Sequence, residues 1–563
     1  MSSLMTQEMR LRATPLAASQ RIYVSLALAL LTAIWFLLPV GRPLTHPDEG
    51  RYAEIPREML VSGDWVTPRL NDLAYLEKPP LQYWATALAY KVFGPNEWSA
   101  RLYLALSGWL NVVLIFLLGR RLWDTRTGTI AAALLASSVL YFVMGQLLTL
   151  DMTFTFLLTA MLCCFCMAQL NRESARRASG WWMLLSWSML GLAVMTKGIV
   201  ALLIAGAVLS IYILWQRDWA ALRTLRLLPG LAIVLVVTVP WFVLVSRANP
   251  DFLQFFFIHE HLQRYLTDSA DRVEPWWYFI AIFAAGILPW LWQMGSALAQ
   301  GWRNTAPRGQ FDVARLLWVW CVFLMVFFSL SQSKLPPYIL PVLPALALLT
   351  ARREASAPAT RSLNSSVWIM IASAVALVAF TLIAPGMHSN PLVQSTSHEA
   401  RPMAIAYALT TTIAALFYYR AALKQQRLRS FVSLAVGWFL GLSLLFATIG
   451  QDGSLRSGRD LAASIPAELA AHAPIFSVLT YDQTLPFYLQ RTTTLVVYRG
   501  EFDYGLQHEP EKGLSLDEFK QRWRAASDAA AIMPHVTYQQ LVDAALPMRV
   551  LGTDQRRVAV SRR

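Results

Sequence analysis

The sequence predicts an all-α polytopic membrane protein that ends in a small soluble α/β domain. Hydrophobic residues make up 56% of the chain and charged residues 15%, and the mean hydropathy is +0.43. Apolar runs of roughly the 20 residues that a helix needs to cross a bilayer recur up to Gly450. After Gly450 the pattern changes to short β-rich and helical segments. An ordinary soluble protein with one hydrophobic core is therefore excluded.

The apolar runs predict about thirteen membrane-spanning helices. Arg10, Arg12 and Arg21 precede the first run, as in a signal peptide. That run lacks a small-residue cleavage site and many spans follow it, so we expect it to be retained as the first helix. The expected spans lie near Ile22–Val40, Trp98–Leu118, Thr129–Leu147, Met152–Leu170, Trp181–Met195, Ile199–Trp215, Leu227–Val245, Tyr278–Trp292, Leu316–Leu330, Tyr338–Leu349, Val367–Ala384, Met403–Tyr419 and Phe431–Ile449.

Arginine clusters set the expected orientation of these helices. They occupy alternate connections, which begin at Arg120, Arg172, Arg217, Arg352 and Arg420. The positive-inside rule places those connections and the N-terminus in the cytoplasm, and the odd number of spans then places the C-terminal domain on the opposite, outer side. The same clusters account for much of the net charge of +14. The charge is therefore assigned to membrane topology, and no nucleic-acid partner is expected.

Two of the expected outer loops are longer or more polar than a simple turn. Gly41–Glu97 contains two short amphipathic stretches, Arg51–Leu60 and Leu81–Phe93. Both are too short to span the bilayer and suit the membrane interface. The second loop, Ser246–Pro275, is rich in aromatic, His and Arg residues.

The segment after the last span predicts a separate domain. We divide the chain into a transmembrane domain, residues 1–450, and a periplasmic α/β domain, residues 451–563. The expected strands of the second domain are Ile475–Leu479, Thr494–Tyr498, Arg549–Leu551 and Arg557–Val560, and its expected helices are Asp460–Ala471 and Leu516–Ala526.

Two acidic clusters are candidates for a shared site. Asp48 and Glu49 lie a few residues beyond the first span, and Asp151 lies between two apolar runs with almost no loop. An ionisable group so close to lipid needs a partner or a function, although an ordinary water-exposed loop is the alternative for the first pair. Because the span before Asp151 leads outward, Asp151 is expected on the same face as Asp48.

Basic residues on the same face predict an anionic ligand. Lys78, Lys197 and Lys334 each lie at interface depth on the outer side, against the positive-inside bias. Arg264, in the segment His259–Tyr265, carries a planar group that can bind two phosphate oxygens. The alternative for each lysine is simple snorkelling to the headgroups. Taken together they favour a lipid-linked phosphate.

A divalent metal ion is a further hypothesis. Glu77 and His259 could hold it, and it would help to neutralise a phosphate. His259 and His261 would point apart on a helix, so ordinary surface polarity remains open for this segment. No organic cofactor is expected.

Taken in order, these motifs resemble those of the GT-C glycosyltransferases, and specifically of the bacterial aminoarabinose transferases that modify lipid A. The resemblance extends to about Gly450, and the C-terminal domain shows no motif that could be tied to a function. The motifs are His46–Tyr52, Tyr75–Pro80, Leu150–Asp151, His259–Tyr265 and Ser333–Tyr338.

The resemblance implies an inverting pentosyltransferase. Its donor would be undecaprenyl phosphate carrying 4-amino-4-deoxy-L-arabinose, and its acceptor a lipid A phosphate. The reaction would take place at the periplasmic face of the bacterial inner membrane, in a monomer surrounded by membrane lipids. Modification of lipopolysaccharide and resistance to polymyxin are implied by the family.

The resemblance also implies roles for individual residues. Asp48 and Asp151 would flank the catalytic cavity, and Lys78 and Arg264 would hold the carrier phosphate, with Asp48, Asp151 and Lys78 as the catalytic set. The remaining expected site residues are Glu49, Arg51, Tyr52, Tyr75, Glu77, Lys197, His259, Lys334 and Tyr338.

Two other functions remain open at this point. A GT-C mannosyltransferase acting on protein or glycan would need a general base for its hydroxyl acceptor, whereas a phosphate acceptor is already largely dianionic at neutral pH. A lipid or ion transporter would use the outer charges as a binding site, but it predicts charges near the bilayer midplane rather than at span ends.

Overall fold

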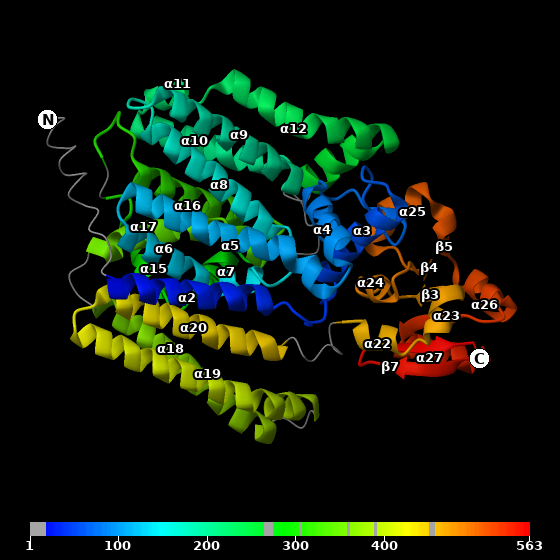
Figure 1. The fold of residues 1–563 in the computed structure, drawn as a ribbon. Coiled ribbons are helices and arrows are strands. Elements are labelled where there is room, and N and C mark those ends of the chain that lie inside the picture. The colour runs from blue at the N-terminus through cyan, green and yellow to red at the C-terminus, as the bar shows by residue number, and fades with distance from the viewer. Residues whose placement is uncertain are drawn as a thin grey trace.

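A bundle of long helices forms one end of the molecule and an α/β domain forms the other (Figure 1). The computed structural model describes residues 18–263, 274–303, 306–356, 361–387, 391–449 and 457–562. The predicted boundary between the two domains, at residues 450 and 451, lies outside the described residues.

The helical part of the described chain runs from α2 to α20. Its elements are α2 (Ala18–Leu37), α3 (Asp48–Ser62), β1 (Arg69–Leu70), β2 (Leu73–Ala74), α4 (Leu81–Phe93), α5 (Glu97–Leu122), α6 (Thr125–Ser137), α7 (Val139–Met144), α8 (Asp151–Leu170), α9 (Arg176–Lys197), α10 (Val200–Gln216), α11 (Trp219–Thr224), α12 (Leu227–Ala248), η1 (Gln254–Gln263), α14 (Tyr278–Gly286), α15 (Leu291–Gln300), α16 (Val313–Leu330), η2 (Pro336–Ile339), α17 (Val342–Ser356), α18 (Arg361–Met387), α19 (Pro391–Leu423) and α20 (Arg427–Ile449).

Eight helices in the described residues are long and apolar enough to cross a membrane by length and composition. They are α5, α8, α9, α12 and α16, together with most of α18, α19 and α20. Arg21–Leu37 of α2 and the whole of α10 are apolar but shorter. The chain is therefore a multi-pass membrane protein, and the expected count of about thirteen spans is not confirmed.

Three of the expected spans are not single long helices. The run Thr129–Leu147 is divided into α6 and α7 at Ser138, whose backbone is extended (φ −69°, ψ 131°) and whose hydroxyl donates to the carbonyl of Leu134. The run Tyr278–Trp292 is divided into α14 and α15, with Pro289 between them. The run Tyr338–Leu349 begins in η2, and α17 starts only after Pro341. Proline lacks an N–H donor and disfavours helical backbone at the residue before it, and hydropathy alone does not register this.

The first outer loop folds into the two short helices that the sequence predicts. α4 leaves Leu88, Val92 and Phe93 exposed by 57%, 72% and 52%, as a helix at a membrane interface would. α3 is different because most of its length is buried. It lies between the bundle and the C-terminal domain (Figure 1), so protein rather than lipid covers it.

The C-terminal part of the described chain is an α/β domain. The sequence predicts four of its six strands and misses β5 and β6, which are respectively very short and poor in β-branched residues. Its elements are α22 (Arg459–Ala463), α23 (Ala467–His472), β3 (Ile475–Val478), α24 (Leu485–Leu489), β4 (Thr494–Val496), η3 (Gly500–Phe502), α25 (Asp503–His508), η4 (Pro510–Lys512), β5 (Gly513–Leu514), α26 (Leu516–Ala525), β6 (Ala530–Pro534), α27 (His535–Asp543), β7 (Arg549–Thr553) and β8 (Arg557–Ser561).

The six strands form one mixed sheet in the order β5-β4-β3-β6-β8-β7. β5, β4, β3 and β6 are parallel, and β8 pairs antiparallel with both β6 and β7. Phe476 pairs in register with Thr494 and Ala531. Its ring packs on Phe519 and Trp523 of α26, which form the core on that face of the sheet. The domain therefore has a hydrophobic core of its own.

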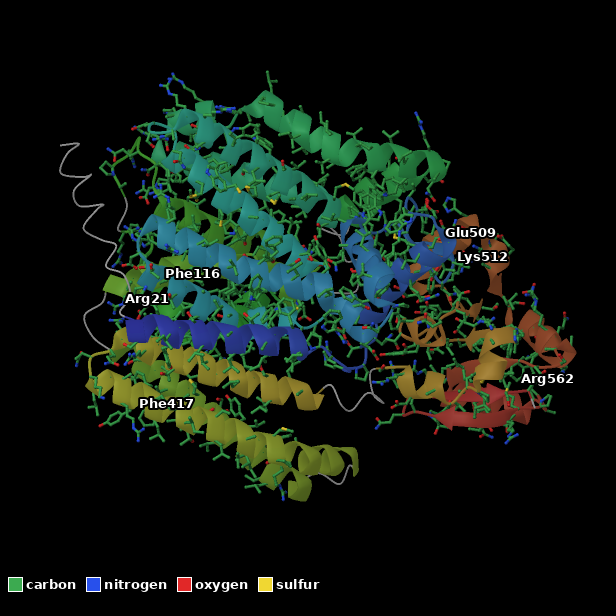
Figure 2. All side chains as sticks on the ribbon, viewed as in Figure 1. Arg21, Phe116, Phe417, Glu509, Lys512 and Arg562 are labelled. Atoms are coloured by element: carbon green, nitrogen blue, oxygen red, sulfur yellow. The ribbon has the colours of Figure 1, made fainter. Side chains whose placement is uncertain are left out.

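Many polar contacts join this domain to the first outer loop. The amide of Leu44 donates to the hydroxyl of Tyr488 at 2.7 Å, and Asn71 Nδ2 donates to the carbonyl of Thr493 at 2.7 Å. Glu509 accepts from Arg69 at 3.0 Å and also pairs with Lys512; both Glu509 and Lys512 are labelled in Figure 2. The position of the loop is therefore set by the C-terminal domain as well as by the bundle.

Gly50 marks the closest approach between α3 and the C-terminal domain. A Cβ atom at this position would overlap the backbone of Gln483 and Thr484. Backbone atoms cannot move aside as a flexible side chain can, so only glycine fits here.

Gly50→Ala is expected to destabilise the protein by about 1–3 kcal/mol, because the added methyl group must push α3 and the C-terminal domain apart. Thermal unfolding of the purified protein in detergent measures the effect. Gly206→Ala is the matched control, since the Cβ position of Gly206 on α10 meets no atom within 4 Å. Equal stability of the two variants would refute the close approach.

Candidate active site

A polar cavity of about 460 Å³ opens where the bundle, the first outer loop and the C-terminal domain meet. Segments that are far apart in the sequence contribute to its wall: the start of α3, the start of α8, the end of α9, η1, η2 and η3. The lining residues are Asp48, Arg51, Tyr52, Glu77, Lys78, Thr149, Leu150, Asp151, Lys197, His259, Glu260, Leu335, Pro337, Tyr338, Gly500 and Glu501.

Asp48 enters the cavity as the first residue of α3. Its carboxylate accepts from Arg51 at 2.9 Å, one helical turn later, and its side chain remains 49% exposed. Arg51 also donates to Glu501 of the C-terminal domain, at 2.6 Å from Nε and 2.5 Å from Nη2. Burial alone would lower the pKa of Arg51, but the groups around it, led by Tyr75 and Glu501, raise it above its usual range. Arg51 therefore holds a fixed positive charge that orients Asp48.

Asp151 and Lys197 form an ion pair in another part of the wall. Asp151 begins α8 and Lys197 ends α9, and because these two helices pack antiparallel their ends meet. The ammonium group of Lys197 also lies 4.6 Å from the ring centroid of Tyr338 and 5.5 Å from that of Phe154. The carboxylate and the two rings therefore fix the position of this cation.

Lys78 lies in the third part of the wall, next to η1. Its ammonium group is 3.1 Å from a carboxylate oxygen of Glu260 and 3.8 Å from one of Glu77. His259 Nδ1 lies 3.5 Å from the other oxygen of Glu260. The structure thus brings Lys78, Glu77 and His259 together, with Glu260 between the cation and the imidazole.

Glu49, which the sequence predicts as a substrate-binding residue, is not among the described residues that line the cavity. The side chain is 2% exposed and accepts from Arg101 at 2.7 and 2.9 Å and from Arg42 at 3.1 Å. It also accepts from the amides of Leu148 at 3.0 Å and Thr45 at 2.9 Å. Burial would raise its pKa, but the two arginines hold the pKa well below its usual range. Glu49 is an internal anion with a structural role.

Two other predicted binding residues also lie outside the wall. Tyr75 is buried, and its ring lies 5.6 Å from the guanidinium carbon of Arg51, so it supports a wall residue rather than a ligand. Lys334 is 5% exposed and donates to the backbone carbonyl of Glu274 at 2.9 Å. Neither Tyr75 nor Lys334 is among the described lining residues, so substrate contact by these two side chains stays a prediction. Arg264 lies outside the described residues.

Glu49→Gln is expected to destabilise the fold by about 3–5 kcal/mol, because Arg42 and Arg101 would be left buried without a countercharge. Thermal unfolding and the yield of monodisperse protein measure this loss. Glu173→Gln is the control, since Glu173 is 90% exposed and its pair with Arg172 is weak. A stable Glu49→Gln protein that fails only in substrate binding would restore the original prediction.

Glu501 and Gly500 are wall residues that sequence reasoning misses. They belong to the C-terminal domain, in which no motif suggested a site, and no local pattern could have identified them. Glu260 is within a motif that the sequence singled out, and its adjacency to His259 was a usable signal. Tyr52, Lys197 and Tyr338 line the cavity, where the sequence placed them.

An apolar groove of about 390 Å³ adjoins the cavity and shares Lys78, Lys197, Glu260 and Tyr338 with it. Apart from two serines, aliphatic and aromatic side chains form the rest of its lining. These are Phe154, Ile199, Val200, Leu203, Phe257, Phe327 and Phe328, together with Ser331 and Ser333. The pair of sites suits an amphiphile with a charged head and a long hydrocarbon chain.

A metal ion held by Glu77 and His259 stays a hypothesis. Within the described residues no group of three or more His, Cys, Asp or Glu side chains could hold a metal ion. Two protein ligands are fewer than the three or four that zinc takes from a protein, and Lys78 lies against both Glu77 and Glu260. No chemical step is therefore derived through a metal at this position.

The activity of this site is expected to persist after treatment with a strong chelator, because Lys78 and Lys197 already supply positive charge in the cavity. Turnover before and after chelation is the measurement. Loss of activity that added Zn²⁺ or Mg²⁺ restores would show that the metal hypothesis for Glu77 and His259 is correct.

Two family models match the chain. Residues 21–256 match the dolichyl-phosphate-mannose-protein mannosyltransferase model, and residues 461–562 match the aminoarabinose transferase C-terminal domain. The crystal structure of ArnT from Cupriavidus metallidurans bound to undecaprenyl phosphate superimposes with a TM-score of 0.88 at 35% identity, covering 97% of this chain and 99% of that one. The archaeal oligosaccharyltransferase AglB from Archaeoglobus fulgidus shares the fold alone, with a TM-score of 0.52 at 11% identity.

Fold and site together define a multi-pass membrane glycosyltransferase of the GT-C class. An undecaprenyl phosphate-α-4-amino-4-deoxy-L-arabinose arabinosyl transferase of Erwinia tasmaniensis is 31% identical over 543 residues, which cover 93% of this chain and 96% of the relative. A Pseudomonas aeruginosa protein of the same name is 34% identical over 516 residues, covering 88% of this chain and 90% of the relative. The chain belongs to this family of arabinosyl transferases.

Proposed function

We propose that the protein transfers 4-amino-4-deoxy-L-arabinose from undecaprenyl phosphate to a phosphate group of lipid A. The observation that carries the proposal is the junction of the polar cavity with the apolar groove at Lys78, Lys197 and Tyr338. A polyprenyl chain fits the groove, and its phosphate would then lie beside the two ammonium groups. The two similar arabinosyl transferases are named for this donor, and the similar ArnT crystal structure contains undecaprenyl phosphate, which supports the same assignment.

The charge balance of the cavity supports an amino sugar as the transferred group. Asp48, Glu77, Asp151, Glu260 and Glu501 are acidic, whereas Arg51, Lys78 and Lys197 are the cationic residues among the described lining residues. Among these described residues the carboxylates exceed the arginine and lysine cations by two. This surplus favours a ligand that brings positive charge, as the 4-ammonium group of the sugar does, and it also favours the cationic character that the sugar ring develops during transfer.

The proposed reaction is a single displacement. An oxygen of the acceptor phosphate forms a bond to the anomeric carbon, while the bond between that carbon and the carrier phosphate oxygen breaks. Undecaprenyl phosphate leaves with an added negative charge, and the anomeric centre is inverted. The acceptor phosphate is already largely dianionic at neutral pH, so no residue has to remove a proton from it.

Individual residues divide this work. Lys78 and Lys197 stabilise the charge that develops on the departing phosphate. Their partners Glu260 and Asp151 hold them in place before the donor binds, and the phosphate then competes with these carboxylates. Asp48, oriented by Arg51, contacts the sugar as its ring becomes cationic.

The acceptor and the compartment follow from the same reasoning. The cavity opens at the end of the bundle that the arginine clusters assign to the outer side, which is the periplasmic face of the bacterial inner membrane. The phosphorylated lipid present on that face is the proposed acceptor, and the monomer is the proposed functional unit. Modification of lipid A phosphate would lower its negative charge and so reduce the binding of cationic peptides such as polymyxin.

A protein mannosyltransferase is the alternative that the match over residues 21–256 raises. The match of residues 461–562 to an aminoarabinose transferase domain argues against it, since Gly500 and Glu501 of that domain line the cavity. A hydroxyl acceptor would also need a general base, and Asp48 and Asp151 are both engaged with cations.

Asp48→Asn and Lys78→Ala are each expected to reduce transfer by about a hundredfold or more, because each removes a charge that acts on the transition state. The assay uses reconstituted protein with the lipid-linked amino sugar and lipid A, and mass spectrometry detects the added sugar. Asp72→Asn and Lys91→Ala are matched controls in the same outer loop, where both residues lie outside the cavity wall. Full activity of either cavity variant would remove that residue from the mechanism.

Product analysis separates the proposed function from its alternative. An added mass on lipid A that matches the amino sugar supports the proposal. Sugar found on a serine or threonine side chain, with lipid A unmodified, would establish the protein acceptor instead.

A further inference from the structure

A second pocket lies at the opposite end of the bundle from the active-site cavity. Its volume is about 420 Å³, and α2, α19 and α20 form its walls. Figure 2 labels Arg21 on α2 and Phe417 on α19 at this end, away from the C-terminal domain. The described residues that line it are Ser19, Ile22, Tyr23, Leu26, Phe417, Arg420, Ala421, Lys424, Gln426, Arg429 and Ser433, and we refer to it as the basic pocket.

The charge of the basic pocket is strongly positive. Arg420, Lys424 and Arg429 contribute three cations, and no described lining residue is acidic. Within the part of the chain that the structure describes, none of the three forms an ion pair. The nearby Arg427 differs, because it pairs with Glu354 at 2.7 Å. Three adjacent cations without a carboxylate repel one another unless an anion lies between them.

One of these cations is held rigidly. Arg429 Nη2 donates to Ser19 Oγ of α2 at 2.8 Å, and Nη1 donates to Gln426 Oε1 at 2.8 Å. Tyr23 and Ser433 join the same two helices through a hydroxyl contact of 3.0 Å. Within the described residues the Nε atom of Arg429 is buried without a hydrogen-bond partner. Both α2 and α20 therefore fix the guanidinium group at the wall of the pocket, which is the arrangement of a preformed anion site.

Apolar side chains continue from the basic pocket along the outside of the bundle. Ile22 and Leu26 of α2 are 62% and 65% exposed, and Phe417, Ile413 and Leu409 of α19 are 55%, 52% and 58% exposed. The three residues of α19 are spaced by four positions, so they lie along one face of that helix. A ligand at this place meets cations at one end and a hydrocarbon surface at the other.

We propose that the basic pocket binds a glycerophospholipid with an anionic headgroup, drawn from the leaflet opposite the active site. The phosphate lies among Arg420, Lys424 and Arg429, and an acyl chain runs between α2 and the exposed face of α19. The apolar wall selects a lipid over a soluble phosphate, which would leave that wall unused. The lipid joins α2 to the α19–α20 pair, so it stabilises the packing of the first helix against the last two.

Native mass spectrometry of the full-length protein tests this assignment. Purified protein is titrated with phosphatidylglycerol or with phosphatidylcholine, and the retained lipid is counted. The wild type is expected to retain one phosphatidylglycerol in preference to phosphatidylcholine. The double variant Arg420→Glu/Lys424→Glu is expected to lose this retention by about tenfold or more, because each cation near an anionic headgroup contributes to binding. The thermal midpoint of the wild type should rise with phosphatidylglycerol and that of the variant should not.

Arg353→Glu is the matched control. Arg353 is an exposed residue at the end of α17, on the same face of the bundle, and it lies outside the basic pocket. The control should retain phosphatidylglycerol as the wild type does. Transfer activity measured in detergent should be equal in all three proteins, which shows that each is folded. If the double variant fails to fold, the single variant Lys424→Gln is expected to show a smaller loss of the same lipid.

Three results would overturn the proposal. Equal retention of phosphatidylglycerol by the folded variant and the control would mean that the basic pocket is not the site. Equal retention of phosphatidylcholine would mean that the cations do not select the headgroup. Complete displacement of the lipid by millimolar inorganic phosphate would identify a soluble anion as the occupant.

Discussion

The buried carboxylate of Glu49 is the interaction on which the geometry of the active site depends. It lies between Arg42 and Arg101, so it joins the segment after α2 to α5, and it accepts from the amide of Leu148 in the connection before α8. Asp48 is its neighbour in α3, and Asp151 follows Leu148 by three residues. Because one carboxylate ties both backbone segments together, the acidic residues beside it are brought to one cavity although about a hundred residues separate them in the chain. The large desolvation cost of such an ion is offset only when every oxygen is paired, as it is here.

The overall architecture could be predicted because it depends on hydrophobic periodicity and on charge distribution. The interruptions of the helices could not be predicted, because hydropathy does not depend on the extended backbone at Ser138 or on the effect of Pro289. Within the site, Asp48, Lys78 and Asp151 were identifiable as ions at span ends, and they do line one cavity. Glu49 belongs to the same motif as Asp48 but does not line the cavity. The sequence does not show toward which side of the chain each of these two side chains points, whereas the three-dimensional structure does.

The C-terminal domain completes a site that the bundle alone leaves open. Glu501 holds Arg51, which in turn orients Asp48, so a residue near the end of the chain controls one near its beginning. Sequence reasoning found no function for this domain because the contribution is a single carboxylate without a local motif.

The cavity contains paired ions, Lys197 with Asp151 and Lys78 with Glu260, so a phosphate that enters exchanges one partner for another. Such an exchange avoids exposing an isolated charge in a partly dry space.

The close approach at Gly50 makes the shape of α3 and the shape of the C-terminal domain depend on each other. The surface of α3 and the backbone of the Gln483–Thr484 turn fit each other without room for a methyl group. A drift in one of these surfaces changes the shape that the other must match. Recombination that replaces the C-terminal domain with that of a distant relative would preserve activity only when the α3 surface is exchanged with it. The first outer helix and the final domain are therefore one unit for the engineering of this protein, even though hundreds of residues separate them in the chain.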